Sequence, residues 1–196
     1  SGVFATGDPE MQNLHRPVAI FLMLQAGIWA QPALAEMTLV SGDIAEGQSL
    51  GADQVFAGSG CEGGNLAPSL SWQGAPEATK SYVVTAFDPD APTGSGWWHW
   101  SVFNIPAGVT SLAEGAGRPD NPLPAGAIAA RNDFSQNGFG GACPPEGGAA
   151  HRYVFTVYAM PQEALPLDET ASGAIVGYYA NAASLARASI TAVFGR

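Results

Sequence analysis

Short apolar segments, separated by turns rich in glycine and proline, make up most of the chain from residue 37 onward. The segments Tyr82–Phe87 and Tyr153–Tyr158 are apolar almost throughout, which predicts strands that are covered on both faces. Together with the frequent turns, this pattern is typical of an all-β sandwich of two packed antiparallel sheets. The predicted strands are Met37–Val40, Leu70–Trp72, Ser81–Asp88, Trp98–Ile105 and Arg152–Met160.

Two long segments fall outside this strand pattern. Residues 108–145 are dense in Gly, Pro, Asn and Asp, and loops of this length in a compact domain usually carry function or are disordered. Residues 170–194 are rich in alanine and lack proline, and their apolar residues recur at helical spacing. We therefore expect one or two C-terminal helices, with apolar positions at Ile175, Tyr178, Tyr179, Ala182 and Leu185.

The N-terminal region has the layout of an export signal. Arg16 precedes an apolar run from Val18 to Ala30, and a small-x-small sequence ends at Ala35. Residues 11–35 are therefore predicted to be a signal peptide that begins at Met11 and is cleaved before Glu36. Residues 1–10 look like vector or upstream sequence, and residues 36–196 suffice for a single domain with a sizeable core. The mature protein would then be periplasmic or secreted.

The alternative for the apolar run is an uncleaved membrane anchor. A spanning helix needs ~20 predominantly apolar residues, whereas this run is shorter and Gln25 and Gln31 interrupt the region. A retained leader would have to bury its apolar side chains, for instance against a second copy of the chain in a homodimer.

Charge narrows the choice of partners. The chain has 17 acidic and 7 basic residues and a formal net charge of −10. A field of this sign opposes nucleic acids and anionic membrane surfaces, so no nucleic-acid partner is expected. Any anion that the protein binds must therefore be held by local geometry against the overall field.

Cys61 and Cys143 are the only cysteines. In an oxidising compartment two thiols tend to form a disulfide, although two unrelated buried thiols remain the alternative because sequence does not give their separation. No CxxC pair or neighbouring histidine suggests a zinc site, and we expect no metal or other cofactor.

The two histidines of residues 36–196 each lie beside a proline-rich loop. The sequence DPDAP at 88–92 leads to His99, and the double proline at 144–145 leads to His151. Since alternate side chains of a strand share a face, His151 and Tyr153 should lie opposite Arg152. By the same rule, one face of the preceding strand should carry Trp97, His99 and Ser101, and the other Trp98 and Trp100.

These strand ends predict a small concave site at one rim of the sandwich. Imidazole and phenol groups are hydrogen-bond donors that suit a phosphate-like oxyanion. The carboxylates of Asp88 and Asp90 would either orient a protonated histidine or face the ammonium of a zwitterionic headgroup. The alternative is that both histidines are structural and that the prolines only form turns. The predicted lining is Asp88, Trp97, His99, His151 and Tyr153.

The order of DPDAP, WxH at 97–99 and PPxxxxxHRYxF at 144–155 resembles the paired signature motifs of the phosphatidylethanolamine-binding protein family, the family of Raf kinase inhibitor protein. The resemblance extends to NLAPSLSW at 65–72 and to GWWHWSVFNIP at 96–106, which is similar to the bacterial branch. It implies a Greek-key β-sandwich with short peripheral and C-terminal helices. It also implies an anion pocket formed by Asp88, Asp90, Trp97, His99, Pro145, His151 and Tyr153.

The resemblance carries three further points. It implies a cis bond between Ala91 and Pro92. Cys143 stands where animal members have a glycine before the double proline, and Gly94 stands where they have a tyrosine before the WxH tryptophan. The ligand preference of animal members is therefore not transferred to this chain.

The expected function is that of a non-enzymatic protein that binds phosphate-type anions or phospholipid headgroups. Modulation of a kinase or protease is a habit of the family. The alternative from another class is a hydrolase of small phosphate or carboxyl esters that uses the same His/Asp pocket, but no HExxH metal motif is present. A third alternative, a structural envelope protein, predicts no bound anion.

Overall fold

The computed structural model describes residues 1–3 and 36–196. The predicted signal peptide, residues 11–35, lies outside the described residues. Residues 36–196 form one compact unit. Within the described part of the chain, no helix is both long and apolar enough to cross a membrane.

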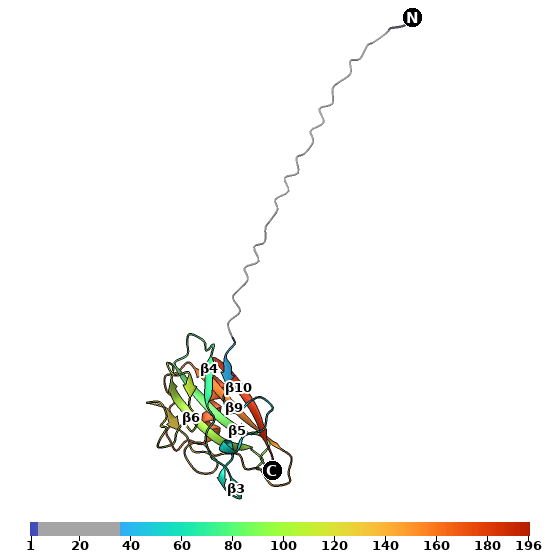
Figure 1. Cartoon of the computed structure of the whole chain (residues 1–196). Helices are drawn as coiled ribbons and strands as arrows, with labels where there is room; N and C mark the ends of the chain where they lie inside the picture. The colour runs from blue at the N-terminus through green and yellow to red at the C-terminus, as the bar shows by residue number, and fades with distance from the viewer. Residues whose placement is uncertain (4–35) are drawn as a thin grey trace. The chain divides into compact units, whose positions relative to one another are not determined.

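An antiparallel five-stranded sheet forms the centre of the domain (Figure 1). Its spatial order is β10-β9-β5-β6-β8, so β9 returns through a long connection to lie beside β5. This order is the Greek-key arrangement that was expected. The strands are β5 (Ser81–Asp88), β6 (Trp97–Pro106), β8 (Ile128–Ala129), β9 (His151–Met160) and β10 (Ala186–Phe194).

A smaller sheet packs on one face of the central sheet. Its order is β1-β4-β7, and β1 also contacts β10. A separate two-stranded hairpin, β2-β3, stands near the C-terminus of the chain (Figure 1). The bounds are β1 (Thr38–Val40), β4 (Leu70–Gln73), β7 (Ser111–Leu112), β2 (Ala57–Gly58) and β3 (Cys61–Glu62), with a short 3-10 helix at Ala52–Gln54.

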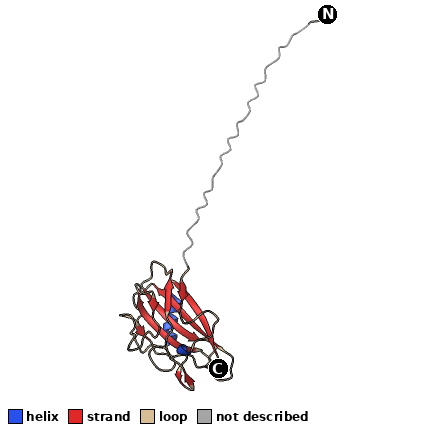
Figure 2. Cartoon of the chain, in the orientation of Figure 1, coloured by secondary structure: helices blue, strands red, loops and turns tan. Residues whose placement is uncertain are grey.

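The central sheet is covered on both faces, as its apolar strands predicted. On one face Val84 and Trp100 lie in the core shared with the small sheet, which contributes Leu70. On the other face Val83 packs with Val176 of helix α1 (Gly173–Ala183). Val83 and Val84 are neighbours in sequence and both are fully buried. Figure 2 shows the helix lying against the strands. The all-β sandwich is confirmed.

The five predicted strands are present, and each predicted end differs from the observed end by at most one residue. The prediction for the C-terminal segment is only half right. Helix α1 begins after Ser172, whose side chain accepts a hydrogen bond from the amide of Ile175. From Ala186 to Phe194 the chain is instead strand β10, paired along its whole length with β9. The helical spacing ends near Leu185, and the edge of the central sheet then supplies a partner for β-branched residues.

Candidate functional site

A pocket of about 270 Å³ opens where β5 ends and where β6 and β9 begin. The antiparallel register brings these strand ends to one edge, since Asp88 is paired with Trp97 and Phe87 with Val154. Six of the seven residues predicted from the sequence line this pocket. They are Asp88, Trp97, His99, Pro145, His151 and Tyr153.

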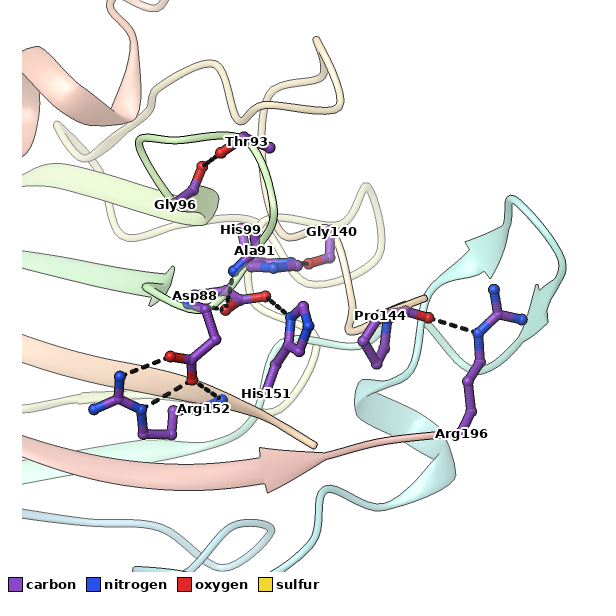
Figure 3. A network of polar contacts seen from close by, with 11 residues as sticks. Asp88, Ala91, Thr93, Gly96, His99, Gly140, Pro144, His151, Arg152 and Arg196 are labelled. Atoms are coloured by element: carbon purple, nitrogen blue, oxygen red, sulfur yellow. Dashed lines mark hydrogen bonds and ion pairs between the residues drawn. The ribbon is translucent and has the colours of Figure 1, made fainter. Parts of the chain in front are cut away.

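Asp88 organises the base of the pocket (Figure 3). Its side chain is buried, and one carboxylate oxygen accepts hydrogen bonds from the amides of Asp90 at 2.8 Å and Ala91 at 3.0 Å. The other oxygen lies 2.7 Å from Nδ1 of His151. Asp88 therefore closes the DPDAP turn and fixes the ring of His151 at the same time.

The contact with Asp88 occupies Nδ1 of the His151 ring and does not involve Nε2. A carboxylate oxygen only accepts, so Nδ1 is the nitrogen that donates to Asp88. When His151 is protonated, its Nε2–H is a charge-assisted donor with Asp88 as counter-ion. When it is neutral in this tautomer, Nε2 presents a lone pair. As predicted, Tyr153 shares this face, and Arg152 lies exposed on the other side of the strand.

His99 is buried between two aromatic rings. Its centroid lies 5.1 Å from that of Tyr153 and 5.6 Å from that of Phe134, both in edge contacts. Nδ1 lies 2.7 Å from the carbonyl oxygen of Gly140. Burial lowers the pKa of His99, and the Gly140 carbonyl and the charge of Asp88 oppose this only in part. The neutral form is therefore favoured at neutral pH.

Two further residues that line the pocket carry neutral N–H or O–H groups. Burial, followed by the charge of Asp88, raises the pKa of Tyr153, so its hydroxyl keeps its proton. The indole N–H of Trp97 is buried and has no hydrogen-bond partner within residues 36–196. Because an unpaired buried donor is costly, a ligand that accepts from Trp97 would recover that cost.

Asp90 was predicted in the pocket, but the structure places it outside. Its two carboxylate oxygens bind the guanidinium of Arg152 at 2.7 and 2.9 Å, and one oxygen also accepts from the Arg152 amide. These hydrogen bonds lower the pKa of Asp90 to about 2. Arg152 points to the side of β9 opposite His151. Because Asp90 binds Arg152, its carboxylate lies on that side too, away from the pocket.

A β-bulge overturns the predicted orientation of Trp100. Phe87 is paired with Trp98 and Ala86 with Trp100, which leaves His99 as the extra residue of β6. Trp100 consequently lies in the inner core rather than beside Trp98. Trp98 faces α1, where a Cβ at Gly173 would lie 2.5 Å from its side chain.

The Ala91–Pro92 bond was expected to be cis from the resemblance, and this is wrong. Among the described residues no peptide bond is cis. In the turn with its trans bond, Asp88 accepts the Ala91 amide and the carbonyl of Ala91 accepts the Thr93 amide at 2.7 Å.

One wall of the pocket is held in place by contacts between residues that are far apart in the sequence. The sulfurs of Cys61 and Cys143 lie 2.09 Å apart in a disulfide that joins the β2-β3 hairpin to the double-proline loop. Arg196 donates to the carbonyl of Pro144 at 2.7 Å (Figure 3) and to the carbonyl of Gly60 at 3.0 Å. Sequence reasoning missed Arg196 because nothing in the pattern indicates this pairing.

Sequence reasoning also missed several residues that line the pocket. Phe134 comes from the long loop at 108–145, whose length was the only signal. The hairpin tip contributes Ser59, which adopts the left-handed conformation with φ of 55°. The remaining lining residues are Ala91, Pro92, Thr93, Cys143 and Pro144.

The sequence also contains one GxSxG string, GQSLG at residues 47–51, which resembles the nucleophile turn of some hydrolases. In the structure Ser49 forms a bridge with Val193 of β10, and its hydroxyl donates to the neighbouring Leu50 carbonyl. Ser49 does not line the pocket. The string therefore adds no nucleophile to the two histidines.

Comparison with known proteins assigns the family. A family model described as phosphatidylethanolamine-binding protein matches residues 40–195. The chain belongs to the phosphatidylethanolamine-binding protein family. The UPF0098 protein YbcL of Escherichia coli is 55% identical over 166 residues, covering 84% of this chain and 90% of YbcL. The crystal structure of YbcL, described as a member of the mammalian PEBP family, has a TM-score of 0.80 and covers 83% of this chain and 99% of that chain.

A second Escherichia coli relative, the UPF0098 protein YbhB, is 49% identical over 158 residues, covering 81% of this chain and 99% of YbhB. A more distant relative is LppC of Mycobacterium tuberculosis. It is 34% identical over 142 residues, covering 72% of this chain and 64% of LppC.

Proposed function

We propose that this protein is a non-enzymatic binder of phosphate-type anions, taken up in the pocket between Asp88, His99 and Tyr153. The observation that carries the proposal is the convergence of donors in a protein of net charge −10. Protonated His151 and the Tyr153 hydroxyl can each donate to one oxyanion, and the indole N–H of Trp97 has no other partner in the described part of the chain.

The size of the pocket limits what can enter it. A volume of about 270 Å³ lies just below the usual range for small-molecule sites. It suits a phosphate, a phosphorylated side chain or a phospholipid headgroup, whereas acyl chains would have to remain outside. Family membership supports a binding role, and modulation of a kinase or protease would follow if the bound group belongs to such a partner.

The proposal also includes export of the protein from the cytoplasm. The signal-like residues 11–35 support export to the periplasm or beyond the cell. A disulfide between Cys61 and Cys143 is consistent with an oxidising compartment.

The proposal is tested by following the indole N–H resonances of the protein during titration with inorganic phosphate and phosphoethanolamine. The Trp97 resonance, assigned by its loss in Trp97→Phe, should move downfield and saturate as its N–H gains an acceptor. A parallel incubation with p-nitrophenyl phosphate and p-nitrophenyl acetate should release no product. Trp97 resonances that never move would contradict the binding site, and turnover that depends on His151 would show an enzyme instead.

A further inference from the structure

The two pocket histidines are not equivalent as hydrogen-bonding groups. Nδ1 of His99 lies 2.7 Å from the Gly140 carbonyl oxygen, which can only accept. Nδ1 must therefore carry the proton. A neutral imidazole has one N–H, so Nε2 of His99 bears a lone pair.

The surroundings of His99 keep the ring in this neutral form. Only 4% of the residue is exposed, and burial lowers its pKa. The charges of two carboxylates, Asp88 and Asp133, act against the effect of burial on this pKa, and each carboxylate has other hydrogen-bond partners. Asp88 is engaged by His151 and the turn amides, while Asp133 accepts the Trp98 amide at 2.7 Å. Tyr153 and Phe134, which pack on the ring, carry no charge at neutral pH.

Nδ1 of His99 is thus occupied by the Gly140 carbonyl, the adjacent Gly141 backbone also acts to raise the pKa of the ring, and His99 lines the pocket. The pocket thus combines an acceptor, Nε2 of His99, with the donors of Trp97, Tyr153 and protonated His151. A ligand that offers only lone pairs would leave one of its oxygens facing another lone pair.

We infer that the pocket selects an oxyanion that carries its own proton; this inference rests on the proposed function. Hydrogen phosphate and a phosphate monoester with a P–OH group can donate to His99 and accept from the other groups. Sulfate and phosphate diesters cannot donate from the oxyanion. The preferred ligand is therefore a phosphate monoester, such as a phosphorylated side chain, rather than the diester of an intact phospholipid.

Two matched pairs of ligands test this inference by calorimetric titration of the wild-type protein. Near pH 8, hydrogen phosphate and sulfate have the same charge and similar size but differ by one proton. Near pH 5.5, methyl phosphate is mostly a monoanion with a P–OH, since the second pKa of a phosphate ester is about 6, and dimethyl phosphate has the same charge without that proton. The protonated member of each pair should bind at least about tenfold more tightly.

The variant His99→Gln provides the complementary result, because an amide NH₂ can donate to sulfate. Its preference for phosphate over sulfate should fall toward one, while the control Asp90→Asn, outside the pocket, keeps the wild-type preference. Should His99→Gln not fold, nitrogen-15 NMR of the wild-type histidines decides, with Nδ1 of His99 protonated and Nε2 not. Equal affinity for phosphate and sulfate, or a proton on Nε2, would overturn the inference and leave the proposed function intact. Absence of binding by every anion would overturn both.

Discussion

Replacing Asp88 with asparagine separates the two tasks that we assign to this carboxylate. Asparagine retains one oxygen for the amides of Asp90 and Ala91 but presents an NH₂ to His151 where the second oxygen was. The His151 ring must then accept at Nδ1, which moves its proton to Nε2. In Asp88→Asn, neutral His151 is therefore already a donor toward the pocket, and it has lost the counter-ion of its charged form.

The expected loss of anion affinity in Asp88→Asn follows from replacing a hydrogen bond from a charged donor with one from a neutral donor. A hydrogen bond to a charged group contributes about 1.5–3 kcal/mol and a neutral bond about 0.5–1.5 kcal/mol. The exchange therefore costs about 1–1.5 kcal/mol in anion binding at low pH, or roughly five- to tenfold in affinity. A similar loss in the free energy of unfolding is expected, since Asp88 is only 3% exposed.

Calorimetric titration with inorganic phosphate at pH 6, 7 and 8 measures this effect. Binding to the wild type should be stronger at pH 6 than at pH 8, because protonated His151 is a charge-assisted donor with Asp88 as counter-ion. In Asp88→Asn the dependence should be flatter, so that the variant binds more weakly than wild type at pH 6 but not at pH 8. Phosphate also changes its own protonation state between pH 6 and pH 8, but it does so equally in the wild-type and variant titrations.

Asp90→Asn is the matched control, because it removes the same charge from the same turn but outside the pocket. It should keep the wild-type slope. If both variants changed the slope equally, the effect would come from the overall field of the protein, and the role of the Asp88–His151 contact would be refuted.

Three further predictions concern stability, measured by urea unfolding. In Asp90→Asn the loss should be about 0.5–1 kcal/mol at pH 7, because the ion pair is partly exposed; with a folded pKa of about 2 below the unfolded value near ~3.9, the difference should vanish as pH falls from about 4 to about 2, and a constant difference would contradict this. Gly173→Ala should destabilise by about 1–2 kcal/mol, since its Cβ would lie 2.5 Å from Trp98 and overpacking outweighs the helix-propensity gain; an increase in stability would show that the contact relaxes freely. Reducing the disulfide between Cys61 and Cys143 should cost about 2–4 kcal/mol and weaken anion binding, and unchanged binding would show that the tie does not hold the pocket wall.

Sequence reasoning located the strands well because their signals are local. Ser81–Asp88 was predicted with the observed bounds, since its apolar run is bracketed by turns. The register of these strands then brought Asp88, His99 and His151 together, because antiparallel partners end at the same edge. Motif and topology therefore accounted for most of the pocket.

The errors arose where a distant contact decides the outcome. Residues 186–194 form a strand because β9 offers a free edge, which local spacing does not reveal. Trp100 turns inward because one residue of β6 is left over at the bulge. Asp90 leaves the pocket because Arg152, 62 positions away, binds its carboxylate in two places.

The central claim, that the pocket binds a phosphate-type anion through His151, is tested most directly by His151→Ala. Calorimetric titration of wild type and variant with inorganic phosphate at pH 6 should show binding at least about tenfold weaker in the variant, because a charge-assisted donor is lost. The folded fraction of each sample is checked by urea unfolding. Equal affinities in fully folded wild type and variant would contradict the account.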